Sequence, residues 1–205
     1  ILVVTDGSND GSELLFQDNQ LVTVYHSPVR AGKMAAVNRV MPYVDTELVV
    51  FTDANTLLNK DALLNIVACF QYPKVGCVSG EKRILQAISN NAAVGGEGLY
   101  WKYESMLKRW SSQLNSAVGA AGELFALRTE LYEHPPADTI LDDFILSLAV
   151  VKKGYKIAYQ PMAYAMVSGS QDVMEEMKRK VRIAAGGLQE IYRTASLLNC
   201  FQYPL

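Results

Sequence analysis

Apolar, β-branched runs alternate with segments of helical periodicity through the first part of the chain. The pattern predicts strands at 1–5, 20–25, 47–52 and 75–83, and helices at 12–18, 33–43 and 61–70. The strand at 47–52 is of the apolar type that is buried on both faces of a parallel sheet. This alternation is typical of parallel strands joined by crossover helices, so we expect an α/β fold with a mostly parallel central sheet flanked by helices.

The second half of the chain has a pattern closer to α+β. It predicts helices at 96–114, 142–153 and 172–193, and strands at 123–127, 155–159 and 163–167. Gly154 is placed to end the second of these helices. No repeat, low-complexity tract or long Pro/Gly/Ser linker divides the sequence, and we therefore expect one domain over residues 1–205.

Composition and charge narrow the class of protein. Half of the 205 residues are apolar and a fifth are charged, which indicates a globular chain, and the formal net charge of −2 argues against a nucleic-acid partner. Three irregularly spaced cysteines do not make a disulfide framework or a four-ligand zinc site. No apolar run approaches the ~20 residues that span a bilayer, so we expect this segment to be soluble. It starts at Ile1, inside an apolar run and without Met, and both ends look cut.

The first two candidate sites follow predicted strands. Asp6 ends the first strand and opens a turn rich in Asp, Gly and Ser, a place where open α/β sheets bind ligands. Residues 30–33, Arg-Ala-Gly-Lys, lead into a helix that holds Asn38, and basic groups at a helix N-terminus favour an anion such as diphosphate. Ordinary turn formation, helix capping and a solvated basic loop are the alternatives for these segments.

The third candidate is the end of the 47–52 strand. Asp53 and Asn55 follow it and offer two oxygen ligands, which suit Mg²⁺ or Mn²⁺ carrying nucleotide phosphates. Because alternate residues of an extended backbone point the same way, both oxygens are expected to face one ion. Turn capping is the weaker alternative.

Two further segments carry concentrated charge. Asp142 and Asp143 begin a helix, where one carboxylate can act as a base while the other caps the helix. Residues 178–182, Lys-Arg-Lys-Val-Arg, place four cations in five residues of the last helix. A solvated basic face is the usual explanation of such a run. A clamp on a leaving diphosphate and contact with anionic lipid headgroups are the functional alternatives.

The order of these segments resembles that of the family 2 glycosyltransferases. The motifs that carry the likeness are Asp-Gly-Ser-x-Asp-Gly-Ser at 6–12, Arg-x-Gly-Lys-x-x-Ala-x-Asn at 30–38, Asp-Ala-Asn at 53–55, Gly-Glu-Leu-Phe-Ala-Leu-Arg at 122–128, Asp-Asp-Phe-Ile-Leu-Ser-Leu at 142–148 and the basic last helix. The likeness covers nearly the whole chain. It is strongest to the membrane-linked branch that includes cellulose, chitin and hyaluronan synthases and bacterial exopolysaccharide and N-acetylglucosaminyl transferases.

The resemblance implies a GT-A nucleotide-diphosphosugar transferase fold, in which a UDP-sugar lies over the carboxyl ends of the strands. Residues 1–83 would form the nucleotide-binding half and 84–205 the acceptor and catalytic half. Carried over by motif, the donor-binding residues are Asp6, Arg30, Lys33, Asn38, Asp53 and Arg179, with Asp53 and Asn55 on the metal. The catalytic residues are Asp143 as general base, its neighbour Asp142, and Arg182 on the diphosphate.

The sequence departs from the family pattern at three places. Asn55 replaces the second Asp of the usual Asp-x-Asp, which should weaken metal binding. Arg179 and Ile183 stand where the family's Gln-x-x-Arg-Trp segment has Gln and Trp. The family's first strand would precede Ile1, so we expect an upstream strand, downstream membrane segments, and a full-length protein at the cytoplasmic face of the plasma membrane.

The expected reaction is a single displacement that inverts the anomeric carbon and passes the sugar to a saccharide or lipid-linked acceptor. One alternative is an Asp-nucleophile phosphatase, because 51–56 also resembles an Asp-x-Asp-x-Thr strand, although Asn55 cannot supply the second acid. The other is a nucleotide-sugar-binding module without turnover.

Overall fold

The computed structural model describes residues 1–16, 18–85, 92–168 and 173–199. The strands are β1 (Leu2–Asp6), β2 (Thr23–Ser27), β3 (Leu48–Thr52), β4 (Leu57–Leu58), β5 (Val75–Leu85), β6 (Leu124–Arg128) and β7 (Lys156–Ser168). The α-helices are α1 (Lys33–Val40), α2 (Ala62–Cys69), α3 (Ala92–Leu114), α4 (Asp142–Lys152) and α5 (Val173–Arg193). The 3₁₀ turns are η1 (Ser12–Leu14), η2 (Met41–Tyr43), η3 (Thr129–Leu131) and η4 (Ala195–Leu198).

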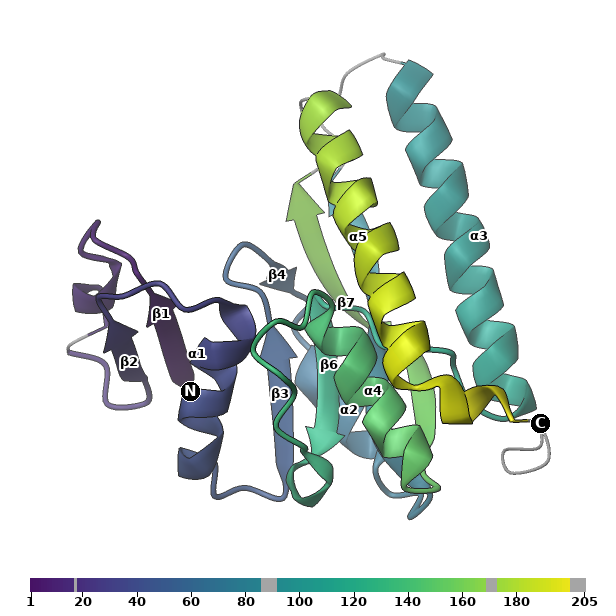
Figure 1. Ribbon diagram of the computed structural model, residues 1–205, viewed down its shortest axis with the longest axis horizontal. Coiled ribbons are helices and arrows are strands. Elements are labelled where there is room, and N and C mark those ends of the chain that lie inside the picture. The colour runs from purple at the N-terminus through teal and green to yellow at the C-terminus, as the bar shows by residue number, and fades with distance from the viewer. Residues whose placement is uncertain (17, 86–91, 169–172, 200–205) are drawn as a thin grey trace.

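The described strands form two sheets (Figure 1). β1 and β2 make a parallel pair beside α1, and the larger sheet has the order β3-β6-β5-β7-β4. Within that larger sheet β5 and β7 are parallel, whereas β3–β6, β5–β6 and β4–β7 are antiparallel. The α/β class is therefore confirmed, but the expectation of a mostly parallel sheet is wrong, because the central sheet is mixed.

The direction of β6 depends on residues 115–123, which connect α3 to β6 and have no periodic pattern of apolar residues. This segment runs across the sheet: the Ala117 amide donates to the Ile157 carbonyl at 2.9 Å, and the Ala121 amide donates to Ser79 Oγ at 3.0 Å. It brings the chain back to the carboxyl end of β3 and the middle of β5 before β6 starts. β6 must then run back between them in the antiparallel direction.

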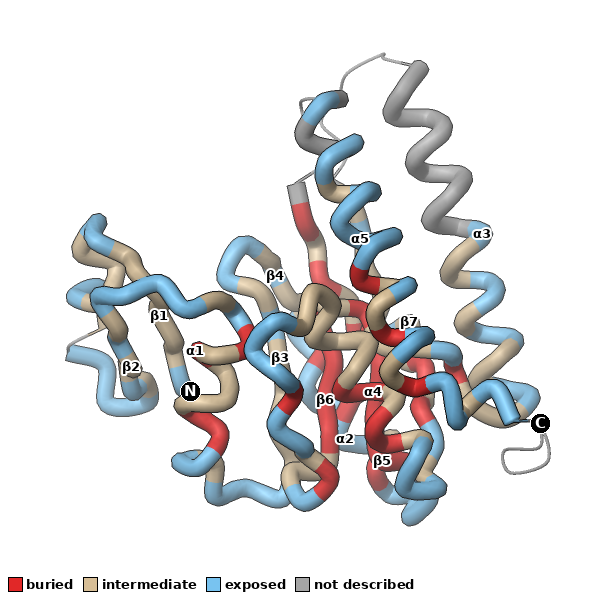
Figure 2. The backbone as a smooth tube through the Cα atoms, viewed as in Figure 1, coloured by how far each residue is buried: buried red, intermediate tan, exposed pale blue. Residues whose placement is uncertain are grey.

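The core has one apolar cluster on each face of the large sheet, because successive strand side chains point to opposite faces. Leu124 and Ala126 of β6 pack with Ile66 of α2, whereas Phe125 and Leu127 pack with residues of α4 and its surroundings. The red segments of Figure 2 follow β5, β6 and β7 through the middle of the molecule. This buried sheet is the rigid support on which the strand ends are held.

Most of the predicted helices and strands occur, with shifted limits, but the helix expected at 12–18 is only the short 3₁₀ turn η1 (Ser12–Leu14). The strands expected at 155–159 and 163–167 are one strand, β7, whose pairing with β5 shifts between Gly80 and Glu81. β4 was not predicted, since two residues give no periodic pattern. The expected start of the last helix, Asp172, lies outside the described residues. Over the part of the chain that is described, no helix combines the length and apolarity that crossing a membrane requires.

Candidate active site

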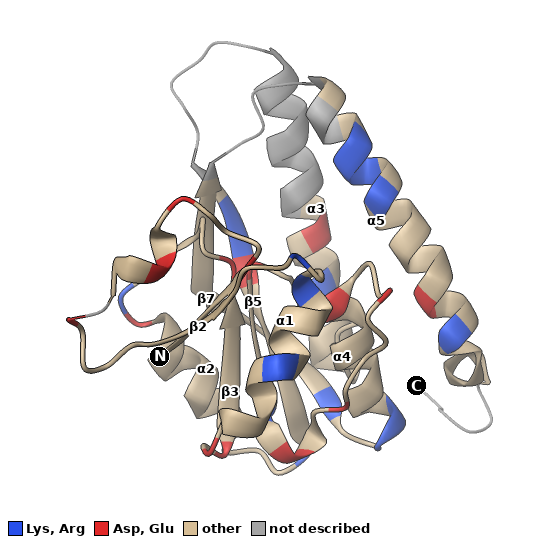
Figure 3. Ribbon diagram, turned by 60° about the vertical axis from the view of Figure 1, so that its left-hand side comes forward, with Lys and Arg blue, Asp and Glu red and all other residues tan. Residues whose placement is uncertain are grey.

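Charged residues from separate parts of the sequence lie where β1 and β3 end and where α1 and α4 begin (Figure 3). Lys33 is the first residue of α1, and its Nζ lies 2.9 Å from Oδ1 of Asp53 and 3.0 Å from Oδ2 of Asp142. The structure thus brings together three residues that the sequence had proposed from three different motifs.

Lys33 is held as a cation by these two carboxylates. Partial burial alone would lower the pKa of its ammonium, but Asp142 and Asp53 raise that pKa to about 12. The side chain is still half exposed, so the ammonium can turn from one anion to another without leaving the site. A lysine in this position can neutralise carboxylates and also contact phosphate oxygens.

Asp142 and Asp143 are neighbours in environments that differ. Asp142 is paired with Lys33, whereas burial and the Asp142 charge raise the pKa of Asp143 to about 6. Gly122 makes room for the Asp143 carboxyl group, since a Cβ at that position would stand 3.1 Å from Asp143 Oδ2. One acid of the pair is ionised and bridged, and the other has a pKa suited to proton transfer near neutral pH.

A second ion pair lies beside Asp143, and sequence reasoning missed it. Lys82 of β5 and Glu123, which precedes β6, form a largely buried salt bridge. Burial opposes ionisation of Glu123, yet Lys82 holds its pKa below the usual range. The available signal was the charged run Glu81-Lys82-Arg83 at the end of a strand that begins apolar, because a charged residue needs a partner when it is buried. The Glu123 charge also contributes to raising the pKa of Asp143.

Asp6 shapes the loop before α1. Its carboxylate accepts hydrogen bonds from the backbone amides of Ala31, at 3.1 and 3.0 Å, and Gly32, at 2.7 Å. The Ala31 amide is the main cause that lowers the Asp6 pKa. Gly7 has φ +75°, and a Cβ there would lie 2.7 Å from Arg30 Cβ. The Asp-Gly pair therefore fixes where Arg30 emerges, and the predicted contacts of Asp6 and Arg30 with the nucleotide stay predictions.

Asn38 faces protein partners. Its Oδ1 accepts a 2.7 Å hydrogen bond from the Tyr132 hydroxyl, and its Nδ2 donates to the Pro135 carbonyl at 3.0 Å. Burial and the Asp142 charge raise the pKa of Tyr132, so the hydroxyl remains a donor at any ordinary pH. Asn38 and Tyr132 link α1 to the loop before α4. Tyr132 has no sequence pattern that marks it, and the predicted contact of Asn38 with the nucleotide stays a prediction.

The metal-binding candidates lie in a turn. Residues 53–56 are closed by a 3.2 Å hydrogen bond from the Thr56 amide to the Asp53 carbonyl, so the extended geometry expected for Asp53 and Asn55 is wrong. Among the described residues, no group of three or more His, Cys, Asp or Glu could hold a metal ion. Asp53 already attracts one cation, the Lys33 ammonium, and the exposed Asn55 amide stands nearby in the turn. These residues fit an ion that takes most of its ligands from diphosphate and water.

Arg179 and Arg182 lie on α5, which passes the start of α4. The helices meet at Gly186, where a Cβ would stand 2.5 Å from Leu141 Cγ, and Leu141 directly precedes Asp142. Arg182 is one turn before Gly186, so it lies on the side of α5 nearest the acidic pair. The side chain is exposed. The structure brings α5 to the site, and the contacts of both arginines with diphosphate stay predictions.

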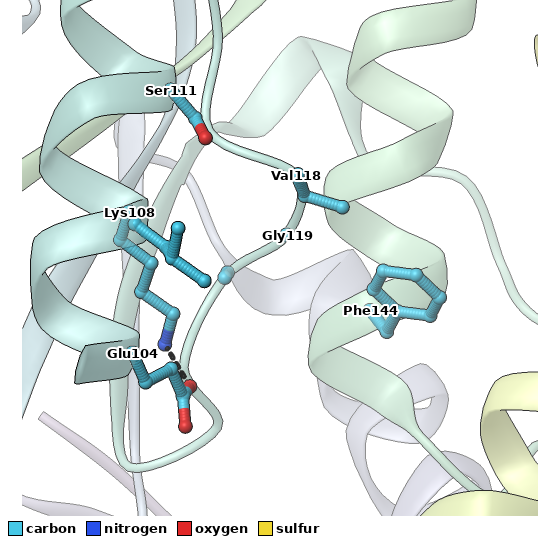
Figure 4. Close-up of a pocket in the computed structure, with 8 residues that line it drawn as sticks. Glu104, Lys108, Ser111, Val118, Gly119 and Phe144 are labelled. Atoms are coloured by element: carbon cyan, nitrogen blue, oxygen red, sulfur yellow. Dashed lines mark ion pairs between the residues drawn. The ribbon is translucent and has the colours of Figure 1, made fainter. Parts of the chain in front are cut away.

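A cavity of about 310 Å³ lies between α3, the segment around Gly119 and the first turn of α4 (Figure 4). The next residue, Phe144, points its ring into this cavity, opposite the Lys108–Glu104 ion pair of α3, whose atoms are 2.9 Å apart. The lining residues are Glu104, Leu107, Lys108, Ser111, Val118, Gly119, Ala120 and Phe144. The cavity combines an aromatic ring and apolar side chains with a few polar groups, as small-molecule sites commonly do.

Solved structures with the same fold define the class. The mannosyltransferase PcManGT from Pyrobaculum calidifontis, solved with GDP-Man and Mn²⁺, superposes with a TM-score of 0.77 at 23% identity over 95% of this chain and 54% of that chain. TarS of S. aureus, residues 1–349 in complex with UDP-GlcNAc, gives a TM-score of 0.58 at 15% identity over 83% and 50% of the two chains. The fold is that of the GT-A glycosyltransferases, as the resemblance implied.

Sequence comparison gives the family. The model described as "Glycosyltransferase like family 2" matches residues 1–186, so the chain belongs to this family of glycosyltransferases. It is 28% identical to the poly-beta-1,6-N-acetyl-D-glucosamine synthase of Staphylococcus aureus (strain COL) over 218 residues, which are 100% of this chain and 52% of that protein. The Staphylococcus epidermidis synthase is also 28% identical, over 94% of this chain and 48% of that protein.

The chain thus spans about half the length of the curated relatives it matches. The family expected from the sequence motifs is confirmed, and nothing supports the Asp-nucleophile phosphatase alternative.

Proposed function

We propose that the chain is the catalytic domain of an inverting glycosyltransferase that uses a UDP-sugar and a saccharide or lipid-linked acceptor. The observation that carries the proposal is the difference within the acidic pair. Asp142 forms an ion pair with Lys33, whereas desolvation raises the pKa of the half-buried Asp143 to about 6, and the next residue, Phe144, lines a cavity of about 310 Å³. Paired acids with separated pKa values are a mark of acid–base chemistry.

The donor lies at the Asp6, Lys33 and Asp53 side of the site in this proposal. Arg30 and Lys33 meet the diphosphate, and Asp6 and Asp53 accept hydrogen bonds from the uridine. A Mg²⁺ or Mn²⁺ ion held by Asp53 and Asn55 would supply charge neutralisation for the diphosphate. Since Lys33 contacts Asp53 and Asp142 before donor binds, we expect it to exchange a carboxylate for a phosphate oxygen as donor enters.

The acceptor approaches from the side of Phe144. Asp143 accepts the proton of an acceptor hydroxyl as that oxygen attacks the anomeric carbon, and the bond from this carbon to the diphosphate oxygen breaks. The electron pair leaves with the diphosphate, whose charge Arg182 and Lys33 stabilise. A pKa of about 6 leaves Asp143 mostly ionised at neutral pH and still basic enough to take a proton. One displacement inverts the anomeric configuration.

The names and bound ligands of the related proteins suggest which donor sugar to test first. The poly-beta-1,6-N-acetyl-D-glucosamine synthases are named for an N-acetylglucosamine polymer, and TarS was solved with UDP-GlcNAc. UDP-GlcNAc is therefore the first donor to test, and a β-1,6-linked N-acetylglucosamine oligomer is the first acceptor. Because the matched region is about half of those proteins, attachment of the domain to a membrane is part of this proposal.

The test is transfer from radiolabelled UDP-GlcNAc, UDP-glucose and GDP-mannose with Mn²⁺, with the anomer of the product determined by NMR. We expect transfer with inversion, and we expect Asp143→Asn to reduce the rate by about 10²–10⁴-fold. Asp45→Asn is the matched control, since Asp45 is an exposed aspartate away from the site. Retention of configuration, or an Asp143→Asn rate equal to that of the control, would sink the proposed mechanism.

Binding separates the enzyme from the module without turnover. Calorimetry with UDP and Mn²⁺ measures donor-side binding independently of transfer. UDP binding without transfer to any acceptor would favour the binding module.

A further inference from the structure

Two threonine hydroxyls join the end of β3 to the start of β6. Thr52 is the last residue of β3, and its Oγ1 lies 2.8 Å from Oγ1 of Thr56. The Thr52 hydroxyl also donates to the Glu123 carbonyl at 3.1 Å, and the Thr56 hydroxyl donates to the Asp53 carbonyl at 2.7 Å. The two side chains form a link, which we call the threonine bridge, between the turn at 53–56 and the residue before β6.

The threonine bridge has two proton arrangements, because each hydroxyl has a single proton and can accept as well as donate. When Thr52 donates to Thr56, the Thr56 proton goes to the Asp53 carbonyl. When Thr56 donates to Thr52, the Thr52 proton goes to the Glu123 carbonyl. Both arrangements keep the oxygens in place, so the link between Thr52 and a segment 71 residues further along the chain does not depend on one proton position.

Each end of the threonine bridge adjoins a candidate functional residue. At one end, Asp53 is the candidate donor and metal residue, and its side chain pairs with Lys33 at 2.9 Å. At the other end, Glu123 follows Gly122, where a Cβ would stand 3.1 Å from Oδ2 of Asp143. The bridge therefore connects the turn expected to bind the donor with the segment that packs against the expected base.

Lys33 makes a second connection between the same two sides. Its ammonium contacts Asp53 and also Asp142, which directly precedes Asp143. In the proposed function this connection opens when Lys33 turns to a phosphate oxygen of the donor. The threonine bridge uses hydroxyl and carbonyl groups and no charged side chain, so it can stay closed during that exchange.

We propose that Thr52 and Thr56 are positioning residues, whose hydroxyl bridge keeps the Asp53 turn aligned with the general base while the donor binds. The inference rests on the proposed function and adds to it two residues that act through the alignment of others. Thr52 is exposed, and a hydrogen bond that replaces one to water contributes little to stability, so the bridge is expected to affect alignment more than folding. Small misplacements of reacting groups lower the rate of a displacement strongly.

Valine substitution tests the bridge, because it removes the hydroxyl and keeps the β-branched shape that a strand favours. We expect Thr52→Val and Thr56→Val each to lower kcat for transfer from UDP-GlcNAc at least about tenfold. The affinity for UDP with Mn²⁺, measured by calorimetry, should stay within about twofold, since the Thr56 amide still closes the turn. The double variant should lose no more than either single variant, because both break one bridge. Thr52→Ser keeps the hydroxyl and should restore most of the rate.

Thr46→Val is the matched control. Thr46 precedes β3, is exposed, and donates its hydroxyl to the Leu48 carbonyl at 2.9 Å, so the same substitution removes a comparable hydrogen bond at the opposite end of that strand. The Asp143→Asn variant supplies a second comparison. Because the bridge acts through alignment with Asp143, Thr52→Val should have little further effect on the residual single-turnover rate of that variant. Circular dichroism and thermal unfolding confirm that each variant is folded.

Amide hydrogen exchange detects the bridge without donor, metal or transfer. The amides at 56 and 124 both donate within local turns, to the carbonyls at 53 and 121. In Thr52→Val both amides are expected to exchange faster than in the unmodified protein, because the two segments lose their link. Thr46→Val should leave both rates unchanged.

Two kinetic results would overturn the positioning role. They are a kcat of Thr52→Val equal to that of Thr46→Val, and a double variant whose loss is the product of the two single losses. Absence of transfer by the unmodified protein is a different failure, since it would overturn the proposed function. The exchange experiment stays valid in that case, and unchanged exchange at 124 in Thr52→Val would overturn the bridge itself.

Discussion

The carboxylates on the two sides of the site have different electrostatic surroundings. Asp53 and Asp142 share the Lys33 ammonium, whereas the half-buried Asp143 lies near the Lys82–Glu123 pair, and desolvation together with the Asp142 and Glu123 charges raises its pKa. A carboxylate beside a cation is favoured in its ionised form, and a desolvated carboxyl with a nearby like charge has a raised pKa. In the proposed function, the first side binds the donor and the second transfers the proton.

The strongest test of this division separates donor affinity from turnover. We expect Asp53→Asn to weaken UDP–Mn²⁺ binding at least about tenfold, because a charged ligand of the ion becomes neutral. Asp143→Asn should leave that binding within about twofold while turnover falls by about 10²–10⁴-fold. Calorimetry and steady-state kinetics on both variants measure the two effects. Equal losses of UDP binding in the two variants would show that the sides are not distinct.

Stability should differ between the same two variants. The folded chain keeps the Asp143 proton up to about pH 6, whereas the unfolded chain releases it near the ordinary value of 3.8. Folding therefore takes up a proton in this window, and the free energy of unfolding falls as pH rises from about 4 to 6 and stays lower above it. Asp143→Asn removes this penalty and should stabilise the protein above pH 6 by up to about 3 kcal/mol, at about 1.4 kcal/mol per pKa unit.

Asp53→Asn serves as the contrasting variant in that experiment. The Lys33–Asp53 pair is half exposed, so its loss should change stability by less than about 1 kcal/mol. Urea unfolding at pH 4.5 and pH 7.5 measures both variants. A stabilisation of Asp143→Asn that is equal at the two pH values would contradict the assignment of the raised pKa to Asp143.

The smallest expected effect is a pair of opposite shifts in the pH–rate profile. The kcat of the unmodified enzyme should rise with pH and level off above about pH 6, as Asp143 ionises. Glu123→Gln removes a charge that raises the Asp143 pKa, so the midpoint of the pH–rate profile should move to lower pH. Lys33→Gln removes a charge that lowers the Asp143 pKa, so the midpoint should move to higher pH. The exposed Glu130→Gln is the control. Midpoints that move in the same direction in both variants would contradict the proposed effect of these charges on the Asp143 pKa.

Most of the elements could be predicted from the sequence, because their apolar residues repeat with the period of a helix or a strand. Leu63, Ile66 and Phe70 in the α2 region and the apolar run of β3 are examples. The direction of β6 could not be predicted, since periodicity gives a strand's faces and not its orientation. It was decided by hydrogen bonds of Ala117 and Ala121 to residues far along the chain.

The candidate site was likewise predictable only in part from the sequence. Motif order alone identified Lys33, Asp53, Asp142 and Asp143, because strand ends and helix starts carry ligand-binding residues in α/β folds. Sequence reasoning missed Lys82, Glu123 and Tyr132, since each acts through a partner from a different element. It also expected an extended backbone at Asp53 to Asn55, where the chain forms a turn.

The sequence by itself determined the family, the α/β class and the candidate site residues, because these depend on local patterns and on the order of motifs. Only the tertiary structure decided which of two adjacent aspartates pairs with Lys33 and which has a raised pKa. Burial and the distance to Lys33 set their charges, and both depend on how α1, β6 and α4 pack on the sheet.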